Sequence, residues 1–435
     1  MSTPGSWCVL HVDLGKSLAV VPDDADLAGL QLVFWLDGLP LGRCEVAADD
    51  LPLSTATLAS LASEAVAPAI GYRLFARGFE APMPALEPEL RPPSDATALL
   101  ACEHPLAAVR ERLAGTDVAL EAGGSAAEVS VVVCTRDRPE ALARCLESLR
   151  AAQPRPREIL VVDNAPTSDA THRSVAAMPD VRYVRESRPG LSIARNTGVR
   201  ETTGAIIAFT DDDAVVDPHW IARLAGPFTA RDVMAVTGIV FPGALESEAQ
   251  RMAEDRLWGF AQEFRRRVFD GRYFARMRGR GVPVWHIGAG ANMAIRREAF
   301  SRVGLFDERL GAGAAGCSED SELWYRLLAE GWRCVYEPAA AVSHFHRDDL
   351  DSLRAQWHAY MRGHVVALLV QFARYRDWGN LRRIALQLPF FYLVWLHDVF
   401  RRGVRTEGLL WWAAVSGSAA GVGFYLRHRG TPPVA

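Results

Sequence analysis

The sequence predicts an α/β fold in which an open, mainly parallel sheet is flanked by helices. Two observations lead to this prediction. From Val129 onward, short β-branched apolar runs alternate with segments of helical periodicity, and the links between them are short. Polar residues follow the ends of several apolar runs, which is where ligands bind on such sheets.

The individual elements follow from local patterns. The run VSVVVC at 129–134 is typical of a strand buried on both faces. In the segment that follows, Leu142, Leu146 and Leu149 repeat at helical spacing. Strands are therefore expected at 129–134, 157–165, 181–186 and 205–214, and helices at 138–152, 168–178 and 190–202.

Residues 1–122 are predicted to form a separate, small α+β accessory domain. Two short strands surround a turn at 37–40, and a helix follows that Ser54 could cap. The Pro-rich stretch 82–95 predicts an exposed linker. This part of the sequence contains no catalytic constellation, so a docking or structural module is the simplest interpretation.

The catalytic domain is expected at 123–350, and a helical region at 351–435. The apolar stretches 384–400 and 408–426 are near the lower length for a membrane-spanning helix and are flanked by arginines. They could lie on an anionic membrane surface. The alternative is a buried helical pair that packs on the catalytic domain or on a partner subunit.

Charge and cysteine content limit the possible partners and the cellular compartment of the protein. The net charge of −4 argues against a nucleic-acid partner. Seven cysteines without a CxxC pair fit a reducing compartment. The first residues do not read as a signal peptide. We therefore expect a cytoplasmic protein, in solution or at the cytoplasmic face of the membrane.

Three consecutive carboxylates, Asp211 to Asp213, end the strand expected at 205–214. Such a group is self-repulsive unless a cation or solvent screens it. Carboxylate oxygens suit Mg²⁺ or Mn²⁺, which also bridge substrate phosphates. Strand alternation places Asp211 and Asp213 on one face and Asp212 on the other. A solvated acidic turn is the alternative.

Two further groups could complete a metal-dependent site. Glu319 and Asp320 lie in the first turn of a helix that Ser318 could cap, although both acids could simply complement the helix dipole. His344 and His346 would share one strand face and could both point into the site, although a histidine is more often structural.

A series of motifs follows in order between roughly 129 and 346. The motifs are VSVVVCTRDRPEALARCLESL, ILVVDNAPTSD, GLSIARNTGV, AFTDDDAVVDPHW, GANMAIRREAFSRVGLFDERLG and SEDSELWYRLLAEGW. The series as a whole, rather than any one motif, resembles a known family, the inverting glycosyltransferases of family 2, which have a GT-A fold. The QxxRW signature of processive synthases is not found in the sequence, which favours transfer of single sugars.

The resemblance implies roles for individual residues. Asp320 corresponds to the catalytic base, with Glu319 beside it. The expected metal ligands are Asp213, Asp211 and His344, with Mn²⁺ or Mg²⁺ as the cofactor. The residues expected to contact the nucleotide-sugar are Thr135, Arg136, Arg138, Asp163, Arg195, Asp211 and Asp212.

The predicted reaction is an in-line displacement that moves a sugar from a nucleotide-diphosphate sugar to an acceptor hydroxyl, as in a hexosyltransferase. The acceptor could be a cell-surface glycan, a lipid-linked sugar or a small molecule. Trp285, His286 and Trp324 could line its pocket, although core packing is the alternative. The segment 246–281 is either an acceptor-side flap or an exposed charged helix.

Two other functions fit part of the pattern. A nucleotidyltransferase would usually carry a Gly-rich loop near the first strand, and CTRDRPE at 134–140 contains no glycine. A non-catalytic nucleotide-sugar-binding scaffold would not need the acid at position 320.

Overall fold

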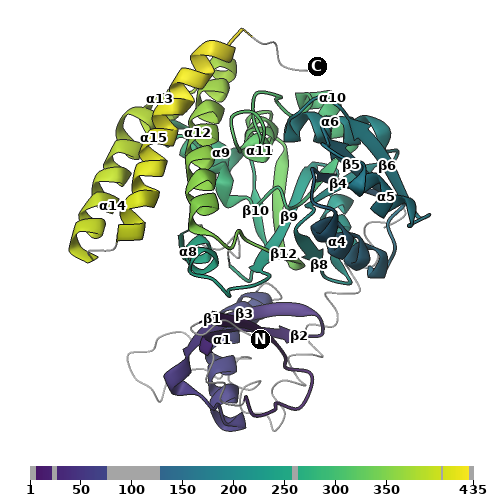
Figure 1. The fold of residues 1–435 in the computed structure, drawn as a ribbon, viewed down its shortest axis with the longest axis vertical. Helices are drawn as coiled ribbons and strands as arrows, with labels where there is room; N and C mark the ends of the chain where they lie inside the picture. The colour runs from purple at the N-terminus through teal and green to yellow at the C-terminus, as the bar shows by residue number, and fades with distance from the viewer. Residues whose placement is uncertain (1–5, 22–26, 76–127, 257–262, 403–404, 431–435) are drawn as a thin grey trace.

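The computed structural model describes residues 6–21, 27–75, 128–256, 263–402 and 405–430. The predicted domain boundary at 122–123 and the Pro-rich stretch 82–95 lie outside these residues. Figure 1 shows a small N-terminal module, a large α/β body and a helical C-terminal region. The predicted fold class is confirmed in this arrangement.

The N-terminal module is a three-stranded sheet with one described helix. Strand β1 (Ser6–Asp13) pairs parallel to β2 (Leu27–Leu36), and β2 pairs antiparallel to β3 (Leu39–Ala47). The turn between β2 and β3 uses Asp37 and Gly38, both with positive φ, as a tight hairpin requires. Helix α1 (Thr55–Phe75) begins where the Thr57 backbone N–H donates to the Ser54 hydroxyl over 3.1 Å, so the predicted cap is confirmed.

The body is a mixed nine-stranded sheet whose main path runs β10-β12-β9-β11-β7-β4-β5-β6, with β8 paired to β12. The strands predicted from the sequence are β4 (Val129–Thr135), β5 (Glu158–Asn164), β6 (Val181–Glu186) and β7 (Ile206–Asp211), and they pair in parallel. Strands β8 (Ala214–Val216), β9 (Val233–Pro242), β10 (Arg267–Phe269), β11 (Asn292–Arg296) and β12 (Arg333–His344) complete the sheet and include antiparallel pairs.

Helices cover both faces of the body because alternate residues of the central strand point in opposite directions. Val131 and Val133 of β4 pack with one set of helices, and Val132 packs with the other. The first set is α4 (Pro139–Ala151), α5 (Ala170–Ala176) and α7 (Trp220–Ala225). The second set is α6 (Leu191–Glu201), α10 (Arg297–Val303) and α11 (Glu319–Ala329).

The segment 246–281 divides into separate elements. Helix α8 (Glu248–Arg256) is followed by residues outside the description, then by β10 and by α9 (Gly271–Met277). Strand β10 joins the edge of the sheet by pairing with β12. The described second half of this segment is therefore built into the body.

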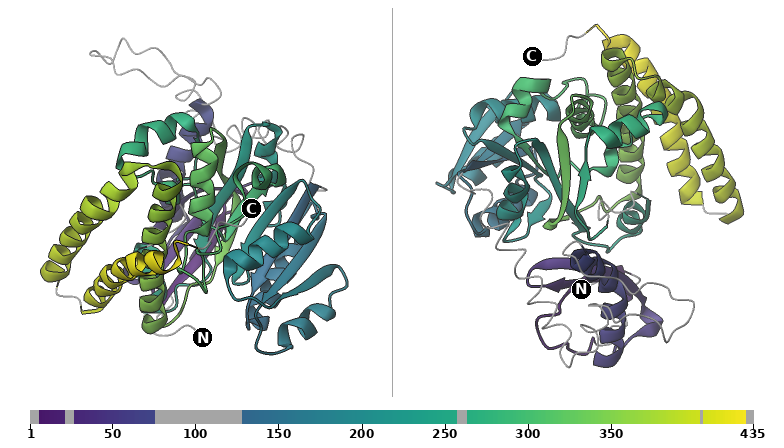
Figure 2. Two further views of the ribbon diagram at one scale, coloured as in Figure 1. Left: turned by 90° about the horizontal axis from the view of Figure 1, so that it is seen from above. Right: turned by 180° about the vertical axis from the view of Figure 1, so that it is seen from behind.

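The C-terminal region, expected to be helical, begins with a long helix whose bounds were not predicted from the sequence, α12 (Leu350–Tyr375). Helix α13 (Trp378–Arg382) and a π-helical turn (Arg383–Gln387) lead into α14 (Leu388–Arg402) and α15 (Arg405–His428). Helix α15 lies along α12, where Gly417 and Gly421 closely approach backbone atoms of α12. Figures 1 and 2 show α14 and α15 on one flank of the body. By length and composition, Thr406–His428 is the one described helix that could span a membrane.

Candidate active site

The site lies at the carboxyl ends of three neighbouring strands, β7, β4 and β5. Thr135 at the end of β4 is in register with Asp163 at the end of β5. On the other side, Cys134 of β4 is in register with Asp211 at the end of β7. Because parallel strands end at the same edge, side chains far apart in the sequence gather here, as expected for an α/β sheet.

Three side chains at this edge could hold a metal ion. One ligand atom each from Asp211, Asp213 and His344 lies within 4.8 Å of the other two. His344 ends β12, and its Nε2 lies 3.1 Å from Asp213 Oδ1. The Phe345 backbone N–H also donates to the Asp213 carbonyl over 3.0 Å, which fixes the turn after β7 against the end of β12.

These groups also influence one another electrostatically. Burial opposes the charged forms of both side chains, but the attraction between His344 and Asp213 outweighs it. The pKa of His344 is raised and that of Asp213 is held well below its usual range. Burial raises the pKa of Asp211, and the nearby charge of Arg195 partly opposes this rise. Two carboxylates and one imidazole form a donor set that suits a divalent cation such as Mn²⁺.

Asp212 lies in the turn after β7, beyond the strand whose alternation was used to predict its face, and it is not one of the three possible metal ligands. Its carboxylate accepts hydrogen bonds from the Thr135 hydroxyl over 2.7 Å and from Arg138 over 2.5 Å. Arg138 also donates to Asp213 over 2.8 Å, so one guanidinium bridges two neighbouring acids. Burial raises the pKa of Asp212 to about 6. Arg136, next to Thr135, is exposed, and its nearest ion-pair partner is Asp137 at 3.9 Å.

Arg195 of α6 lies beneath the site and is 2% exposed. It donates to Glu319 over 2.5 Å and lies 3.4 Å from Asp211 Oδ1. A Cβ atom at Gly290 would lie 2.8 Å from this guanidinium and 3.0 Å from Asp320 Oδ2, so the backbone passes directly over both groups. One buried cation therefore serves acids from β7 and from α11.

Glu319 and Asp320 begin helix α11, as predicted, and its apolar face, with Leu323, Leu327 and Leu328, is buried. The predicted cap is wrong: Ser318 has φ of 71° and makes no capping hydrogen bond. Its hydroxyl lies 3.0 Å from Cys317 Sγ instead. Glu319 is 5% exposed and burial raises its pKa, whereas Asp320 is half-buried.

Asp163 is fully buried at the end of β5 and accepts a hydrogen bond from the Tyr183 hydroxyl over 2.9 Å. Its Oδ1 has no hydrogen-bond partner in the described part of the chain, and burial raises its pKa. A buried carboxylate oxygen without a donor is costly, so a ligand that donates a hydrogen bond there would be favoured.

The comparisons with known proteins agree with this geometry. Residues 130–304 match the model of the family described as Glycosyl transferase family 2. A glucosyl-dolichyl phosphate glucuronosyltransferase of Haloferax volcanii is 27% identical over 249 residues, which are 54% of this chain and 76% of that protein. A pre-mycofactocin glycosyltransferase of Mycobacterium tuberculosis is 29% identical over 229 residues, 52% of this chain, and the match spans 45% of its length. Residues 130–304 therefore form a domain of glycosyltransferase family 2.

Among solved structures, this glycosyltransferase is similar to the mannosyltransferase PcManGT from Pyrobaculum calidifontis in complex with GDP-Man and Mn²⁺. The TM-score is 0.45 at 17% sequence identity, covering 68% of this chain and 87% of the other.

The three predicted acceptor residues lie in different surroundings. Trp324 is fully buried in the core, which fits the packing alternative. Trp285 is half-buried, and the Arg383 guanidinium lies 4.0 Å from the centre of its ring. His286 beside it is exposed. His346 lies outside the group of possible metal ligands, and its Nε2 is 3.7 Å from Glu254 instead.

Two residues of the site were not predicted from the sequence. Tyr183 holds the Asp163 carboxylate, but a tyrosine in a short strand carries no functional signal of its own. Gly290 admits Arg195 and Asp320 to the same place. The run GAGAN at 288–292 could have indicated this close approach, because glycine is used where backbone must come near other groups.

Proposed function

We propose that this glycosyltransferase transfers a hexose from a nucleotide-diphosphate sugar to an acceptor hydroxyl, with inversion at the anomeric carbon. The observation that carries the proposal is the group Asp211, Asp213 and His344 at the same sheet edge as Asp320. The first three residues suit the leaving group, and Asp320 suits the attacking hydroxyl.

Asp213, Asp211 and His344 would hold Mn²⁺ or Mg²⁺. The fit rests on the oxygen and nitrogen donors within 4.8 Å and on the buried His344 Nδ1, which has no hydrogen-bond partner among the described residues. When bound, the cation would offset negative charge on the departing nucleoside diphosphate. Arg138 already bridges Asp212 and Asp213, so it keeps these carboxylates in place for that task.

Asp163 would bind the nucleoside. Its buried Oδ1 has no hydrogen-bond donor among the described residues, and a base or a ribose hydroxyl can donate to it. Thr135 and Arg138 line the same edge and orient Asp212. Arg136 is exposed beside them and is free to move toward the phosphates.

Asp320 would act as the general base that accepts the proton of the attacking hydroxyl. Its half-buried carboxylate at the start of α11 can be reached by an acceptor, whereas Glu319 is locked to Arg195. General-base catalysis typically contributes about 10²- to 10⁴-fold. A single displacement without an enzyme nucleophile inverts the configuration.

Arg195 would act by orienting Asp211 and Glu319 rather than by touching the donor. Its guanidinium is almost fully buried, and its contacts are with protein acids and the Gly290 carbonyl. Such a buried cation opposes the effect of burial on the pKa of these acids and fixes the positions of their carboxylates.

The C-terminal helices favour an acceptor at a membrane. Helices α14 and α15 expose Leu386, Phe390, Phe391, Leu393, Val394, Phe400, Leu409, Trp412, Val422 and Leu426 on or next to them. Arg382, Arg401 and Arg427 are exposed near their ends. This combination suits the cytoplasmic face of an anionic bilayer, where a lipid-linked sugar or a cell-surface glycan precursor would be presented. A small-molecule acceptor is the alternative, as for a relative named for pre-mycofactocin.

The test uses two variants, Asp213→Asn and Asp320→Asn, with a panel of nucleotide-sugars and either Mn²⁺ or Mg²⁺. We expect Asp213→Asn to lose metal-dependent nucleotide binding in calorimetry. We expect Asp320→Asn to keep that binding and to lose transfer by about 10²- to 10⁴-fold. Asp351→Asn serves as the control, because this side chain is 88% exposed on α12.

Each alternative function has a distinct result in the same experiment. Nucleotide-sugar binding without turnover in the wild-type chain would indicate a binding scaffold. Release of pyrophosphate from a nucleoside triphosphate would indicate a nucleotidyltransferase. Full transfer activity in Asp320→Asn would contradict the assignment of the base.

A further inference from the structure

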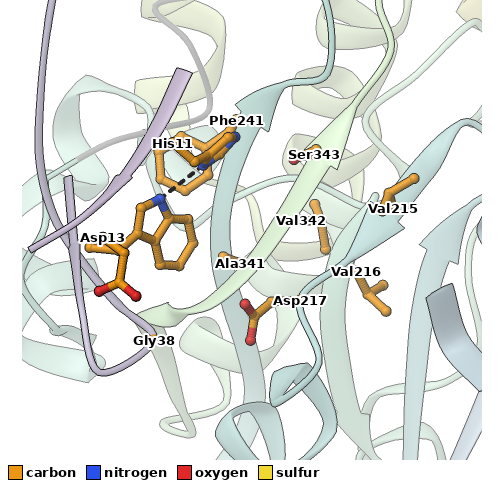
Figure 3. A pocket seen from close by; sticks show the side chains of 11 residues that line it. His11, Asp13, Gly38, Val215, Val216, Asp217, Phe241, Ala341, Val342 and Ser343 are labelled. Carbon is orange, nitrogen blue, oxygen red and sulfur yellow. Dashed lines mark hydrogen bonds between the residues drawn. The ribbon is translucent and has the colours of Figure 1, made fainter. Parts of the chain in front are cut away.

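A cleft lies between the N-terminal module and the body, and none of the active-site acids is among the described residues that line it. Its volume is about 340 Å³, within the range of small-molecule sites. Figure 3 shows His11 and Asp13 on the N-terminal side and Asp217, Ala341 and Ser343 on the side of the body. Trp35 of β2 also lines it.

The cleft and the metal-ligating group use different residues of the same strands. Val215, Ser343 and Phe241 are in register across β8, β12 and β9, and all three line the cleft. Val216 and Val342 line it as well, so residues from both faces of these strands border the cleft. None of the three possible metal ligands is among the described residues that line it.

The walls of the cleft are fixed relative to each other. Arg223 of α7 donates to the Gly38 carbonyl over 2.5 Å and to the Ala339 carbonyl over 3.0 Å, which ties the N-terminal hairpin to the body. The Trp35 indole N–H donates to His11 Nδ1 over 2.8 Å, and the Trp35 ring packs against Phe241. A preformed cleft loses little entropy when a ligand binds.

The side chains of the cleft select the chemical class of the ligand. Among the described residues that line it, none is Lys or Arg, and the carboxylates of Asp13 and Asp217 would repel a phosphate or carboxylate ligand. Asp13 and Asp217 offer acceptor oxygens, which suit hydroxyl donors. Each already has a cation nearby, Lys16 at 3.3 Å and Arg223 at 3.8 Å, so an added cation gains little.

We propose that this cleft is an accessory site for a neutral saccharide, whose C–H face would pack on Trp35 while its hydroxyls donate to Asp13 and Asp217. An aromatic face beside acceptor groups matches a ring that is apolar on its faces and polar at its rim. The proposal goes beyond the proposed function, because this binding needs neither the donor nor a divalent cation.

The test is saturation-transfer NMR on the full chain without metal or nucleotide. The probes are maltose, cellobiose and methyl mannoside, with choline and acetate as cationic and anionic comparators. We expect at least one neutral sugar to bind in the millimolar range and the two comparators not to bind. Trp35→Ala should weaken sugar binding about tenfold, the scale of one lost aromatic contact.

Two further variants make the result specific. Val215→Phe places a large side chain in the floor of the cleft and should also weaken binding, even if Trp35→Ala disturbs the module. Trp378→Ala removes an exposed tryptophan on α13 and should leave binding unchanged. The proposal is overturned if no neutral sugar binds, if choline or acetate binds in preference, or if Trp35→Ala and Val215→Phe both bind as the wild type does. None of these outcomes bears on donor hydrolysis, so the proposed function is tested separately.

Discussion

Two regions of this glycosyltransferase reverse the usual distribution of side chains, in opposite ways. At the carboxyl edge of the sheet, charged side chains are buried: Arg195, Asp212 and Glu319 are each at most 5% exposed. On the C-terminal helices, large apolar side chains are exposed, with Phe390 at 69% and Phe400 at 79%. In most proteins, charged side chains are exposed and large apolar side chains are buried.

The two regions differ in whether the protein itself compensates the reversal. Each buried acid at the sheet edge has a cationic or hydrogen-bonding partner, such as Arg138, Arg195 or His344. The exposed apolar side chains of α14 and α15 have no such compensation among the described residues, so they favour an outside partner. A buried charge network therefore indicates chemistry inside the chain, and an exposed apolar face indicates binding outside it.

The largest expected effect comes from breaking the compensation at the sheet edge. Arg195→Met would leave Glu319 and Asp211 buried without their shared cation. Removing one partner of a buried ionic network typically costs about 3–5 kcal/mol. We expect a loss of this size in the free energy of unfolding, measured by urea denaturation, together with loss of sugar transfer.

The matched control for this variant is Arg302→Met. Arg302 pairs with Glu298 on the exposed surface of α10, and such pairs contribute about 0–1 kcal/mol. Adding Glu319→Gln to Arg195→Met should recover part of the lost stability, because one uncompensated charge disappears. An Arg195→Met protein as stable as the wild type would show that the network is not what holds these acids.

A smaller effect is expected from removing apolar side chains that face outward. The double variant Phe390→Ser, Phe391→Ser should bind vesicles of anionic phospholipid about 10- to 100-fold more weakly in sedimentation, because two apolar contacts with the bilayer are lost. Its free energy of unfolding should hardly change, since both rings are exposed in the isolated chain.

Val20→Ser is the control, since Val20 is an exposed apolar residue of the N-terminal module, 60% accessible. Vesicles of neutral lipid provide a second comparison, because the flanking arginines should favour the anionic surface. Equal binding of wild type and double variant to both kinds of vesicle would contradict a membrane role for the helices.

The fold was largely predictable because its signals are local. Strands β4, β5, β6 and β7 and the helices between them follow from β-branched runs and from leucine spacing. The bounds of helix α12 were not predicted, because its apolar residues do not form a single stripe and its buried face depends on α15, far along the chain. The antiparallel strand β10 has three residues, too few for a periodic signal.

The composition of the site was less predictable than its position. The acids at 211–213 and 319–320 were predicted as site residues because a carboxylate next to buried apolar residues is energetically costly unless it is paired. The burial of Arg195 and the pairing of His346 with Glu254 depend on how α6, α8 and β12 pack, which no local pattern contains. Likewise, Trp324 continues the apolar face of α11, so helix geometry directs it to the core.

The smallest predicted effect compares the two ends of strand β5. Asp163 at the carboxyl end has a pKa raised by burial, whereas Glu158 at the amino end has a lowered one. Burial alone would raise the pKa of Glu158, but hydrogen bonds from the Thr203 backbone, Ser130 and Arg182 outweigh it and lower the pKa to about 2. These contacts tie the starts of β4 and β5 to the end of α6.

A carboxyl whose pKa is lower in the folded state stabilises the protein above its unfolded pKa, here 4.5, and loses that contribution as the pH falls toward 2. We therefore expect Glu158→Gln to lower the free energy of unfolding by about 1–2 kcal/mol near neutral pH, after allowance for solvent screening. The gap to the wild type should narrow as the pH falls below about 4.5, measured by urea denaturation across this range. Glu147→Gln on the exposed face of α4 should show no such dependence. A gap that stayed constant with pH would mean that Glu158 contributes through packing alone, and the contrast between the functional and the structural end of β5 would then not be electrostatic.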